Sequence, residues 1–521
     1  GVAGYAEGGL IAFYSAAVDA RIKSALISGY FGPREHLWEE PIYRNVAGLL
    51  KSFGDAEIAS LIVPRSLTIE YSEAPRIEGP PAPRQGRSGA APGRLWTPEH
   101  YEVEEEIERA RSIFPRDFSI QINFVHGSEG ATVLPGCDAS LRFFCKSLGA
   151  EFTPAKPPPN GHNSILPNAI ERQKRQVQEL VNHVQNQLIV CERERTEGMR
   201  KTAANLSAAQ WSEKRRELRD HFWNDVLGRF PAPQREMNPR SRLIYDGPKW
   251  RGYDVMLDVW PSVYAWGILC VPKDLKPDEK RPVVVCQHGL EGVPRDTIEG
   301  PGSKGYGPYK AFTARLAEQG FITFAPHNPY RGEDKFRTFQ RKSNPLGRTL
   351  FSAIISQHEQ ILNWLQSLSF VDPGRIGFYG LSYGGKSAMR IPAVLDRYVL
   401  SICSADFNDW IRKNVTVYSP YSYMFTMEYD MPEYALGRSF NYAEMAALIA
   451  PRPFMVERGH DDGVAPDEWV AFEFAKVKRF YDKLGIGDKA QIEFFNGPHT
   501  INGAGTFKFL SEHLNWPEPV Q

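Results

Sequence analysis

The stretch Gly377-Phe-Tyr-Gly-Leu-Ser382-Tyr-Gly-Gly385 decides the fold of the second half of this 521-residue chain. A short apolar run leads into it, and Ser382 stands at the centre with Gly380 and Gly384 on either side. The pattern G-x-S-x-G is typical of a nucleophile elbow, a sharp strand-to-helix turn that lifts a serine hydroxyl clear of a sheet. Glycines flank the serine because side chains there would collide with the neighbouring strand and helix. The pattern therefore predicts Ser382 as a nucleophile.

The segments around the elbow have the order that this motif requires. Residues 354–367 carry apolar side chains at helical spacing, residues 372–375 form a turn, and residues 376–379 are β-prone. The segment from Lys386 can open a helix. Further strands are expected at residues 253–258, 266–271, 282–287, 321–325, 400–405, 454–457 and 490–495. Strands that alternate with helices predict an α/β fold with a mostly parallel sheet covered on both faces.

A serine nucleophile needs a base within hydrogen-bond reach and an acid that orients the base. On this kind of fold the three follow the order Ser, acid, His along the chain. Three histidines follow Ser382, namely His460, His499 and His513. His499 lies in a Gly-Pro-His loop just after a predicted strand, whereas His513 falls inside the last predicted helix and His460 adjoins the candidate acids. We therefore predict His499 as the base.

The candidate acids are two adjacent carboxylates, Asp461 and Asp462, in the loop after the preceding strand. The D-x-x-V spacing to Val464 selects Asp461, with Asp462 as the alternative. The oxyanion needs backbone N–H donors, and we expect these to be the amides of Tyr383 and Leu290.

Two features near the elbow suggest substrate contacts. Lys386 falls one turn into the helix after Ser382 and is expected either to reach a substrate oxygen or to lie at the surface. Tyr421 and Tyr423 belong to an aromatic-rich connection after the strand at 400–405. On this fold such a connection overhangs the nucleophile, so we expect these rings in a pocket wall; a core within the insertion is the alternative.

The first part of the chain repeats features of the second. Residues 1–9 match residues 377–385 glycine for glycine, with Ala6 in the place of Ser382. Residues 53–65 match residues 440–452 at eight of thirteen positions, and residues 122–129 lie over residues 492–499. Three matches in the same order predict two tandem copies of one α/β fold.

The first copy lacks the catalytic residue types. Ala6, Ala74 and Glu129 stand where the second copy has its candidate triad, so we expect a catalytically degenerate copy with a structural, substrate-shaping or interaction role. An elbow lies midway through its domain, and an open half sheet is an aggregation hazard. We therefore expect roughly 150 to 250 further residues before Gly1, judged from typical domain size.

The expected organisation has three parts. Residues 1–150 form the later half of the degenerate copy, residues 151–228 a proline-rich linker and helical segment, and residues 229–521 the catalytic domain. Within the first part, a long surface insertion is expected at residues 75–98 and an amphipathic helix at residues 102–114.

Composition argues against several classes of function. Sixty-two basic residues balance sixty-two acidic ones, which argues against nucleic acid as a partner. No apolar run approaches the length of a bilayer span. The six cysteines show neither a C-x-x-C pair nor metal-ligand spacing. The predicted Ser–Asp–His chemistry needs neither a metal nor an organic cofactor, so neither is expected. The sequence leaves homo-oligomer formation open, and a secreted or periplasmic location is compatible with it.

With these residues identified, residues 253–514 resemble the α/β-hydrolase superfamily. The His288-Gly289 loop, Arg331, the Ser382 elbow, Asp461 and His499 look like the acetyl xylan esterase and dienelactone hydrolase branch. This resemblance implies a serine hydrolase that cleaves a small-molecule or carbohydrate-linked ester through an acyl-enzyme, with Arg331 near the substrate.

Two details of the resemblance keep other functions in view. Lys386 is shared with glucuronoyl esterases, but their motif carries arginine where this chain has Tyr383, which argues against a glucuronate substrate. The D-x-x-V acid loop is similar to that of prolyl-oligopeptidase-type peptidases, so a peptidase or amidase is the second enzyme hypothesis. A non-catalytic scaffold is the alternative from another class, although an intact triad in one copy argues against it.

Overall fold

The computed structural model describes residues 1–79, 93–115, 122–154, 168–201, 205–332, 334–425, 433 and 436–517. They form two compact units, the first of residues 1–176 and 341–347 and the second of residues 177–340 and 348–521. The division between the two units falls inside helix α5 (Ala169–Arg195). Most of the expected linker (155–167) and insertion (80–92) lies outside the described residues.

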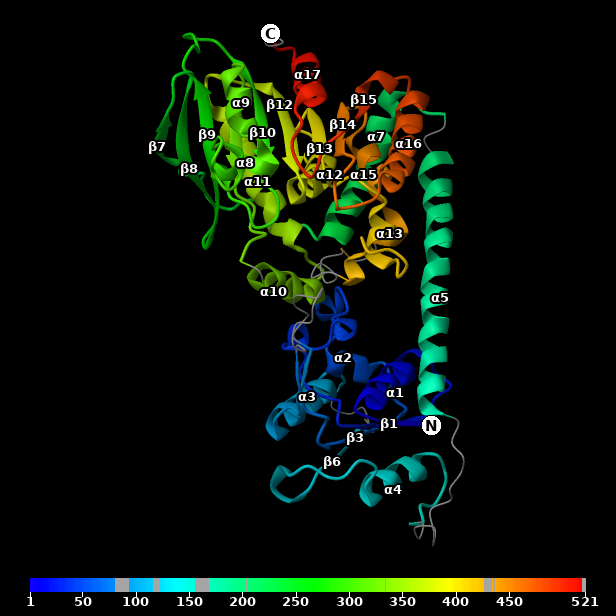
Figure 1. Cartoon of the computed structure of the whole chain (residues 1–521). Helices are drawn as coiled ribbons and strands as arrows, with labels where there is room; N and C mark the ends of the chain where they lie inside the picture. The colour runs from blue at the N-terminus through cyan, green and yellow to red at the C-terminus, as the bar shows by residue number, and fades with distance from the viewer. Residues whose placement is uncertain are drawn as a thin grey trace. The chain divides into compact units, whose positions relative to one another are not determined.

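The second unit is built on a nine-stranded sheet (Figure 1), in the order β15-β14-β13-β12-β10-β11-β9-β8-β7. The six strands from β15 to β11 are parallel, and β9, β8 and β7 add antiparallel pairs at one edge. The strand bounds are β7 (Arg240–Asp246), β8 (Trp250–Trp260), β9 (Val263–Pro272), β10 (Arg281–Gln287), β11 (Ile322–Pro326), β12 (Val371–Leu381), β13 (Leu400–Ser404), β14 (Phe454–Gly459) and β15 (Ala490–Phe495).

Apolar side chains cover both faces of this sheet. Along β10, Val283 and Val285 belong to one buried cluster, while Val284 and Cys286 belong to another. The first cluster draws on helices α11 (Leu350–Ser367), α12 (Tyr383–Val394), α15 (Tyr442–Ile449) and α16 (Asp467–Lys483), and the second on α9 (Phe312–Glu318) and α17 (Ala504–His513). Alternate residues therefore pack against opposite helix layers, as expected of a parallel sheet between helices. This confirms the predicted α/β fold.

The helical segment before the sheet contributes α7 (Ala208–His221) to the second unit. Ser207 caps α7 and forms a capping box with Gln210. The Trp211 indole is fully buried and donates a hydrogen bond to Ala447 O at 2.9 Å. Among the helices of the described ranges, none combines the length and the apolar character needed to span a membrane.

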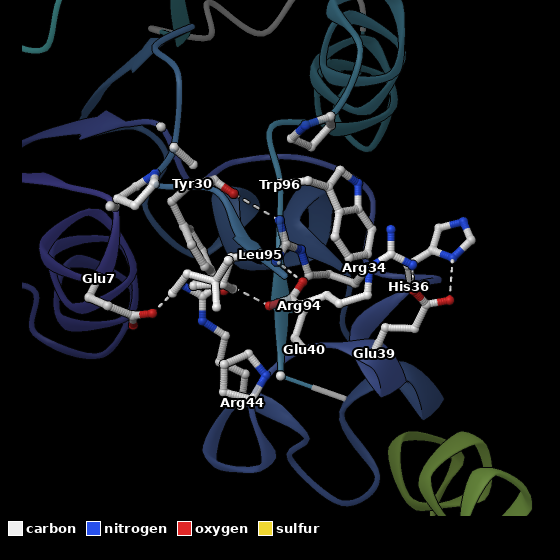
Figure 2. Close-up of a pocket in the computed structure, with 18 of the residues that line it drawn as sticks. Glu7, Tyr30, Arg34, His36, Glu39, Glu40, Arg44, Arg94, Leu95 and Trp96 are labelled. Carbon is white, nitrogen blue, oxygen red and sulfur yellow. Dashed lines mark hydrogen bonds and ion pairs between the residues drawn. The ribbon is translucent and has the colours of Figure 1, made fainter. Parts of the chain in front are cut away.

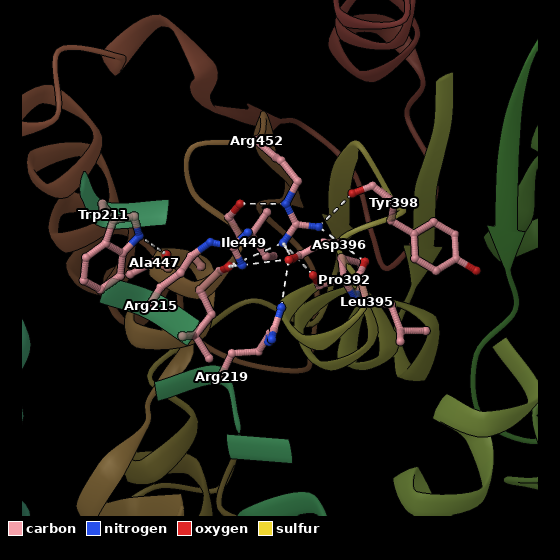
Figure 3. Close-up of polar contacts among 12 residues, drawn as sticks. Trp211, Arg215, Arg219, Pro392, Leu395, Asp396, Tyr398, Ala447, Ile449 and Arg452 are labelled. Carbon is pink, nitrogen blue, oxygen red and sulfur yellow. Dashed lines mark hydrogen bonds and ion pairs between the residues drawn. The ribbon is translucent and has the colours of Figure 1, made fainter. Parts of the chain in front are cut away.

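Three arginines converge on one carboxylate beside α7. Asp396 accepts hydrogen bonds from Arg215 and Arg219, both at 2.9 Å, and Arg452 lies at 3.3 Å as an ion pair (Figure 3). Burial alone would raise the pKa of Asp396, but the bond from Arg215 and the other two positive charges outweigh burial and lower this pKa. The cluster therefore ties α7 to the end of α12.

We expect Asp396→Asn to lower the free energy of unfolding at pH 7 by about 1–2 kcal/mol, since the carboxylate is partly exposed and its ion pairs are screened. A lowered folded-state pKa stabilises above the unfolded pKa, and this stabilisation is lost as pH falls through the folded value. In urea unfolding, the wild-type protein should thus have a higher free energy of unfolding than Asp396→Asn at pH 7, and this difference should shrink below about pH 4. The control is Asp488→Asn, at an exposed aspartate outside this cluster, and an equal loss there contradicts the assignment.

The first unit holds a smaller sheet of four parallel strands, in the order β1-β2-β3-β6. Its helices include α3, which begins and ends two residues before the amphipathic segment predicted at residues 102–114. Phe13, Ile27, Ile69 and Ile107 are among its fully buried side chains. The bounds are β1 (Val2–Tyr5), α1 (Glu7–Val18), β2 (Ser24–Ser28), α2 (Asp55–Ser60), β3 (Ser66–Glu70), β4 (Ile77–Glu78), β5 (Arg94–Leu95), α3 (His100–Ser112), β6 (Ile122–Val125) and α4 (Asp138–Ser147).

The turn between β1 and α1 has an unusual backbone. Ala6 lies at φ 52° and ψ −114°, and its amide donates to Ser28 O at 2.9 Å. A side chain on Gly4 would place Cβ only 1.9 Å from Gly8 O. The first unit therefore contains a sharp strand-to-helix turn with alanine at its apex.

A buried carboxylate sits at the end of the second strand after each of these turns, β3 in the first unit and β14 in the second. Glu70 of β3 accepts hydrogen bonds from the amides of Gly136 and Cys137 at 2.8 and 2.9 Å. Glu457 of β14 accepts from the amide of Gly503 at 2.9 Å. Each carboxylate thus fixes the loop that leads into a later helix, α4 in the first unit and α17 in the second.

Candidate active site

Ser382 lies at the apex of the turn from β12 to α12, with φ 62° and ψ −123°. Its amide donates to Ser404 O of the next strand at 3.0 Å. A Cβ on Gly380 would lie 2.1 Å from Gly384 O, and one on Gly384 would lie 2.3 Å from Gln287 O. These contacts are with backbone atoms, so only glycine fits, and the turn has the geometry of the predicted elbow.

We expect Gly384→Ala to destabilise the protein by about 2–3 kcal/mol, because the added methyl meets the Gln287 carbonyl, which cannot move without shifting β10. Urea unfolding monitored by tryptophan emission measures the change. Gly374→Ala in the exposed turn of β12 is the control, since its nearest neighbour is Asp372 Oδ1 at 3.4 Å. Equal stability of the two variants would contradict the steric argument.

The loop after β10 lies directly against the nucleophile. A Cβ on Gly289 would lie 2.9 Å from Ser382 Cβ. The Gly289 amide donates to the Tyr309 hydroxyl at 2.7 Å, while the Leu290 amide meets no acceptor in the described part of the chain. The Tyr383 amide follows the serine at the first position of α12. The geometry thus places both predicted oxyanion donors on segments that adjoin Ser382.

Neutral histidines hold this loop. His288 is buried; its Nδ1 pairs with Gly289 O at 2.9 Å and its Nε2 accepts from the Asn328 amide at 3.2 Å. His358 Nε2 pairs with Asn328 Oδ1 at 3.2 Å and its Nδ1 with the Tyr398 hydroxyl at 2.7 Å. Burial lowers the pKa of each histidine to about 3. Each ring therefore has one donor and one acceptor role, which fits a neutral imidazole. His288 therefore holds the backbone of the loop that carries Leu290.

These histidines predict a loss of stability in acid. A folded-state pKa below the unfolded value of about 6.5 stabilises above that pH, and the stabilisation is lost as pH falls toward the folded value. The free energy of unfolding, measured in urea, should fall as pH drops from 6.5 to 4. In His358→Leu the pH dependence of this free energy should correspond to about one proton fewer taken up on unfolding, whatever the effect of the substitution at pH 7. His221→Gln, at an exposed histidine of α7, is the control. An unchanged slope in His358→Leu contradicts the assignment.

His499 is paired with a carboxylate in the loop after β14. Its Nδ1 lies 3.0 Å from Asp462 Oδ1, and the Asp462 side chain is fully buried. Asp462 Oδ1 also accepts from the Val464 amide at 2.9 Å. Asp462 Oδ2 lies 3.2 Å from Arg458 Nη1, an ion pair that is not aligned as a hydrogen bond. With Nδ1–H directed at Asp462, Nε2 is the nitrogen left to accept a proton.

The prediction of Asp461 as the acid is wrong for this pair; the partner is the alternative, Asp462. The Asp461 amide donates to Gly497 O at 3.0 Å, and its side chain is exposed. This bond sets the register of the turn, so the next residue points inward. The spacing to Val464 misled the prediction because the Val464 amide is bound by Asp462 itself.

Lys386 is buried beside the elbow, not at the surface. Its Nζ lies 3.6 Å from the Tyr383 ring centroid, 4.5 Å from that of Trp410 and 5.3 Å from that of Tyr423. It has no hydrogen-bond acceptor among the described residues. Burial lowers the pKa of Lys386 to about 7, although the nearby Asp406 carboxylate opposes this shift. A buried ammonium that meets aromatic faces but no hydrogen-bond acceptor among the described residues retains its donors for a further group.

Sequence reasoning missed Lys413 of α13 (Trp410–Val415), which is buried next to this cluster. Its Nζ donates to Tyr421 O at 3.0 Å and to Val464 O of the acid loop, and it lies 4.5 Å from the Tyr423 ring centroid. Burial lowers its pKa to about 8. Nothing in the local sequence distinguishes this lysine from a surface residue, since both acceptors are backbone carbonyls of other segments.

The remaining predicted substrate residues, Tyr421, Tyr423 and Arg331, have different surroundings. Tyr421 offers its carbonyl to Lys413, and its ring meets the edge of Trp469 with centroids 6.4 Å apart. Tyr423 is buried beneath the two lysines. Arg331 is exposed in the loop after β11.

The sheet order, the elbow and the His499–Asp462 pair can now be compared with known proteins. Residues 309–490 match the prolyl oligopeptidase family. The match spans the elbow, and together with the sheet topology it confirms the predicted resemblance to the α/β-hydrolases. The prolyl oligopeptidase match ends before His499, so it gives no information on the partner of that histidine.

One curated relative is the Bacillus subtilis (strain 168) protein YtaP, which carries the name of a hydrolase. It is 31% identical over 142 residues, covering 27% of this chain and 46% of the relative, so the match spans about half of that protein. Among solved structures, a glucuronoyl esterase from Solibacter usitatus is 15% identical, with a TM-score of 0.46 over 60% of this chain and 94% of its own. An acetyl xylan esterase from Paenibacillus sp. R4 is 17% identical, with a TM-score of 0.40 over 54% and 90%.

Proposed function

We propose that the second unit is a serine hydrolase that cleaves a carboxylic ester through an acyl-enzyme. The observation that carries this proposal is the arrangement of three segments: Ser382 on a strained elbow, the Gly289 loop against it, and His499 paired with buried Asp462. Nucleophile, base, orienting acid and backbone donors are the parts that acyl transfer needs.

The residues take the following roles. Ser382 Oγ attacks the ester carbonyl while His499 Nε2 accepts its proton, and Asp462 holds the imidazole through Nδ1. The amides of Tyr383 and Leu290 bind the oxyanion. The C–O bond breaks as His499 returns the proton to the leaving alcohol. Water then attacks the acyl-enzyme with His499 as base, which releases the acid and restores Ser382.

Lys386 is proposed as a donor to a substrate oxygen. Its position one turn from Ser382 and its lack of an acceptor among the described residues support this role. Tyr423 would shape the same wall through its contact with the Lys386 ammonium. For Arg331 the proposal rests on the resemblance alone, and for Tyr421 it rests on its place in the connection after β13.

A peptidase or amidase is the second candidate, supported by the match to the prolyl oligopeptidase family. The catalytic parts are shared, so the substrate decides between the two. Hydrolysis of aminoacyl anilides without hydrolysis of simple acyl esters would favour the amidase.

Labelling with a fluorophosphonate probe tests the hydrolase itself. We expect stoichiometric labelling of the folded protein on the peptide that contains Ser382, and none after unfolding in urea. A panel of p-nitrophenyl esters and aminoacyl anilides then separates the two candidates. A folded sample without labelled Ser382 would overturn the proposal.

We further propose that the first unit is a catalytically degenerate copy of the same fold. The common strand order, the turns at Ala6 and Ser382 and the buried Glu70 and Glu457 support it. Ala6 has no nucleophilic side chain, so this unit would act by binding or support.

A further inference from the structure

The first unit contains a cavity of about 640 Å³ at its Ala6 turn (Figure 2). Ala6 and Glu7 contribute from the turn and the start of α1, and Tyr30 from the segment after β2. Leu95 and Trp96 contribute from β5 and the residue after it. This volume lies in the range of small-molecule sites, roughly 300–1,000 Å³. The cavity thus occupies the place where the elbow of a hydrolase would present its serine.

Arginines and glutamates pair with one another along the cavity wall. Glu40 bridges two arginines, with Arg34 Nη1 at 3.2 Å from one oxygen and Arg44 Nη1 at 2.8 Å from the other. Arg94 Nη1 lies 2.8 Å from Glu39. An added anion or cation would have to compete with an existing partner. The wall therefore favours a ligand without net charge.

These paired groups are held in place before any ligand arrives. Arg34 is buried, and it also donates to Tyr30 O at 2.8 Å and lies 3.3 Å from Asp55 Oδ2. Arg44 also pairs with Glu7, which in turn accepts from the Tyr43 hydroxyl at 2.6 Å. Fixed donors and acceptors bind polar ligands at a low ordering cost.

An aromatic ring supplies the apolar part of the wall. Trp96 is partly exposed; the Arg94 guanidinium lies 5.3 Å from its ring and His36 meets it edge-on at 5.9 Å. Pro98 and Leu95 continue this apolar side. An indole offers a flat apolar face with a polar edge, which suits a ligand of the same mixed character.

We propose that this cavity binds a neutral oligosaccharide. Sugar rings combine apolar C–H faces, which pack on an indole, with hydroxyls that both donate and accept hydrogen bonds. The paired Arg34–Glu40–Arg44 group and the Arg94–Glu39 pair supply those partners without demanding charge. Because Ala6 provides no nucleophile, the sugar is held and not cleaved. This site lies wholly within the first unit and does not depend on chemistry at Ser382.

Calorimetric titration of the full chain carrying Ser382→Ala tests the proposal, because no hydrolysis can then consume or create ligand. The probes are xylotetraose, cellotetraose and maltotetraose, with tetragalacturonate as the anionic comparison. We expect one neutral tetrasaccharide to bind at one site per chain, with a dissociation constant on the order of 1 mM or tighter. Trp96→Ala should weaken binding about tenfold or more.

The control is Phe143→Ala, which removes an exposed aromatic ring from α4 of the same unit, away from the cavity lining. It should leave binding unchanged. Arg94→Ala, at a half-exposed side chain, tests the same wall even if Trp96→Ala fails to fold, and it should weaken binding at least threefold.

Three results would overturn the proposal: no heat with any neutral sugar at about 10 mM, equal binding by the wall variants and the parent, or binding of tetragalacturonate alone. None of these bears on fluorophosphonate labelling, so the two proposals fail separately.

Discussion

Replacing Ser382 by alanine is expected to lower kcat/KM for an aryl ester by about 10⁴-fold or more. The substitution removes the attacking oxygen and leaves the elbow, the Gly289 loop and the His499–Asp462 pair in place. Residual hydrolysis would come from the oxyanion donors acting on bound ester and water. Steady-state kinetics on p-nitrophenyl acetate, with circular dichroism to verify folding, measure the change.

Ser367→Ala is the matched control, because this serine ends α11 and its hydroxyl donates to Trp364 O within the same helix. We expect it to retain the parent rate within about twofold. If Ser382→Ala kept its activity within tenfold, Ser382 would not be the nucleophile and the ester hydrolase proposal would fall.

Asp462→Asn is expected to lower kcat by about 10³- to 10⁴-fold with little change in KM. The carboxylate accepts from His499 Nδ1, and an amide in its place can donate to that nitrogen and leave the imidazole in the wrong tautomer. Asp461→Asn, one residue away and exposed, should stay within about threefold of the parent.

The same ester assay compares these two variants, and the pair is a sharp test because only the position of the amide differs. Loss of the Arg458 ion pair is a second effect of Asp462→Asn, so urea unfolding is measured alongside. A larger loss of kcat in Asp461→Asn would return the acid role to Asp461.

Local sequence rules were sufficient for the elbow and the buried strands. The glycines around Ser382 are required by backbone contacts within a few residues, and the run 282–287 is apolar because both its faces are covered. Strand β7 was not predicted, since it is mostly exposed and lacks an apolar alternation. An edge strand defined mainly by its partner leaves little signal in its own residues.

Details of the site depend on contacts between distant segments. The choice between Asp461 and Asp462 turns on one hydrogen bond to Gly497, and Lys413 is placed by two carbonyls far along the chain. A sequence gives the residue types within a loop but not which of two neighbours faces inward. The duplication and the boundaries of the parts stay predictions from the sequence pattern.

The turn at Ala6 allows the backbone strain of such a turn to be measured where no nucleophile is present. An alanine at φ 52° costs on the order of 1–2 kcal/mol relative to a right-handed conformation, yet here there is no hydroxyl to present. The chain thus has one such turn with a serine at its apex and one with an alanine. The free energies of unfolding of Ala6→Gly and Ser382→Gly, each compared with the parent, would separate the backbone strain of this turn from the further cost of placing a hydroxyl at its apex.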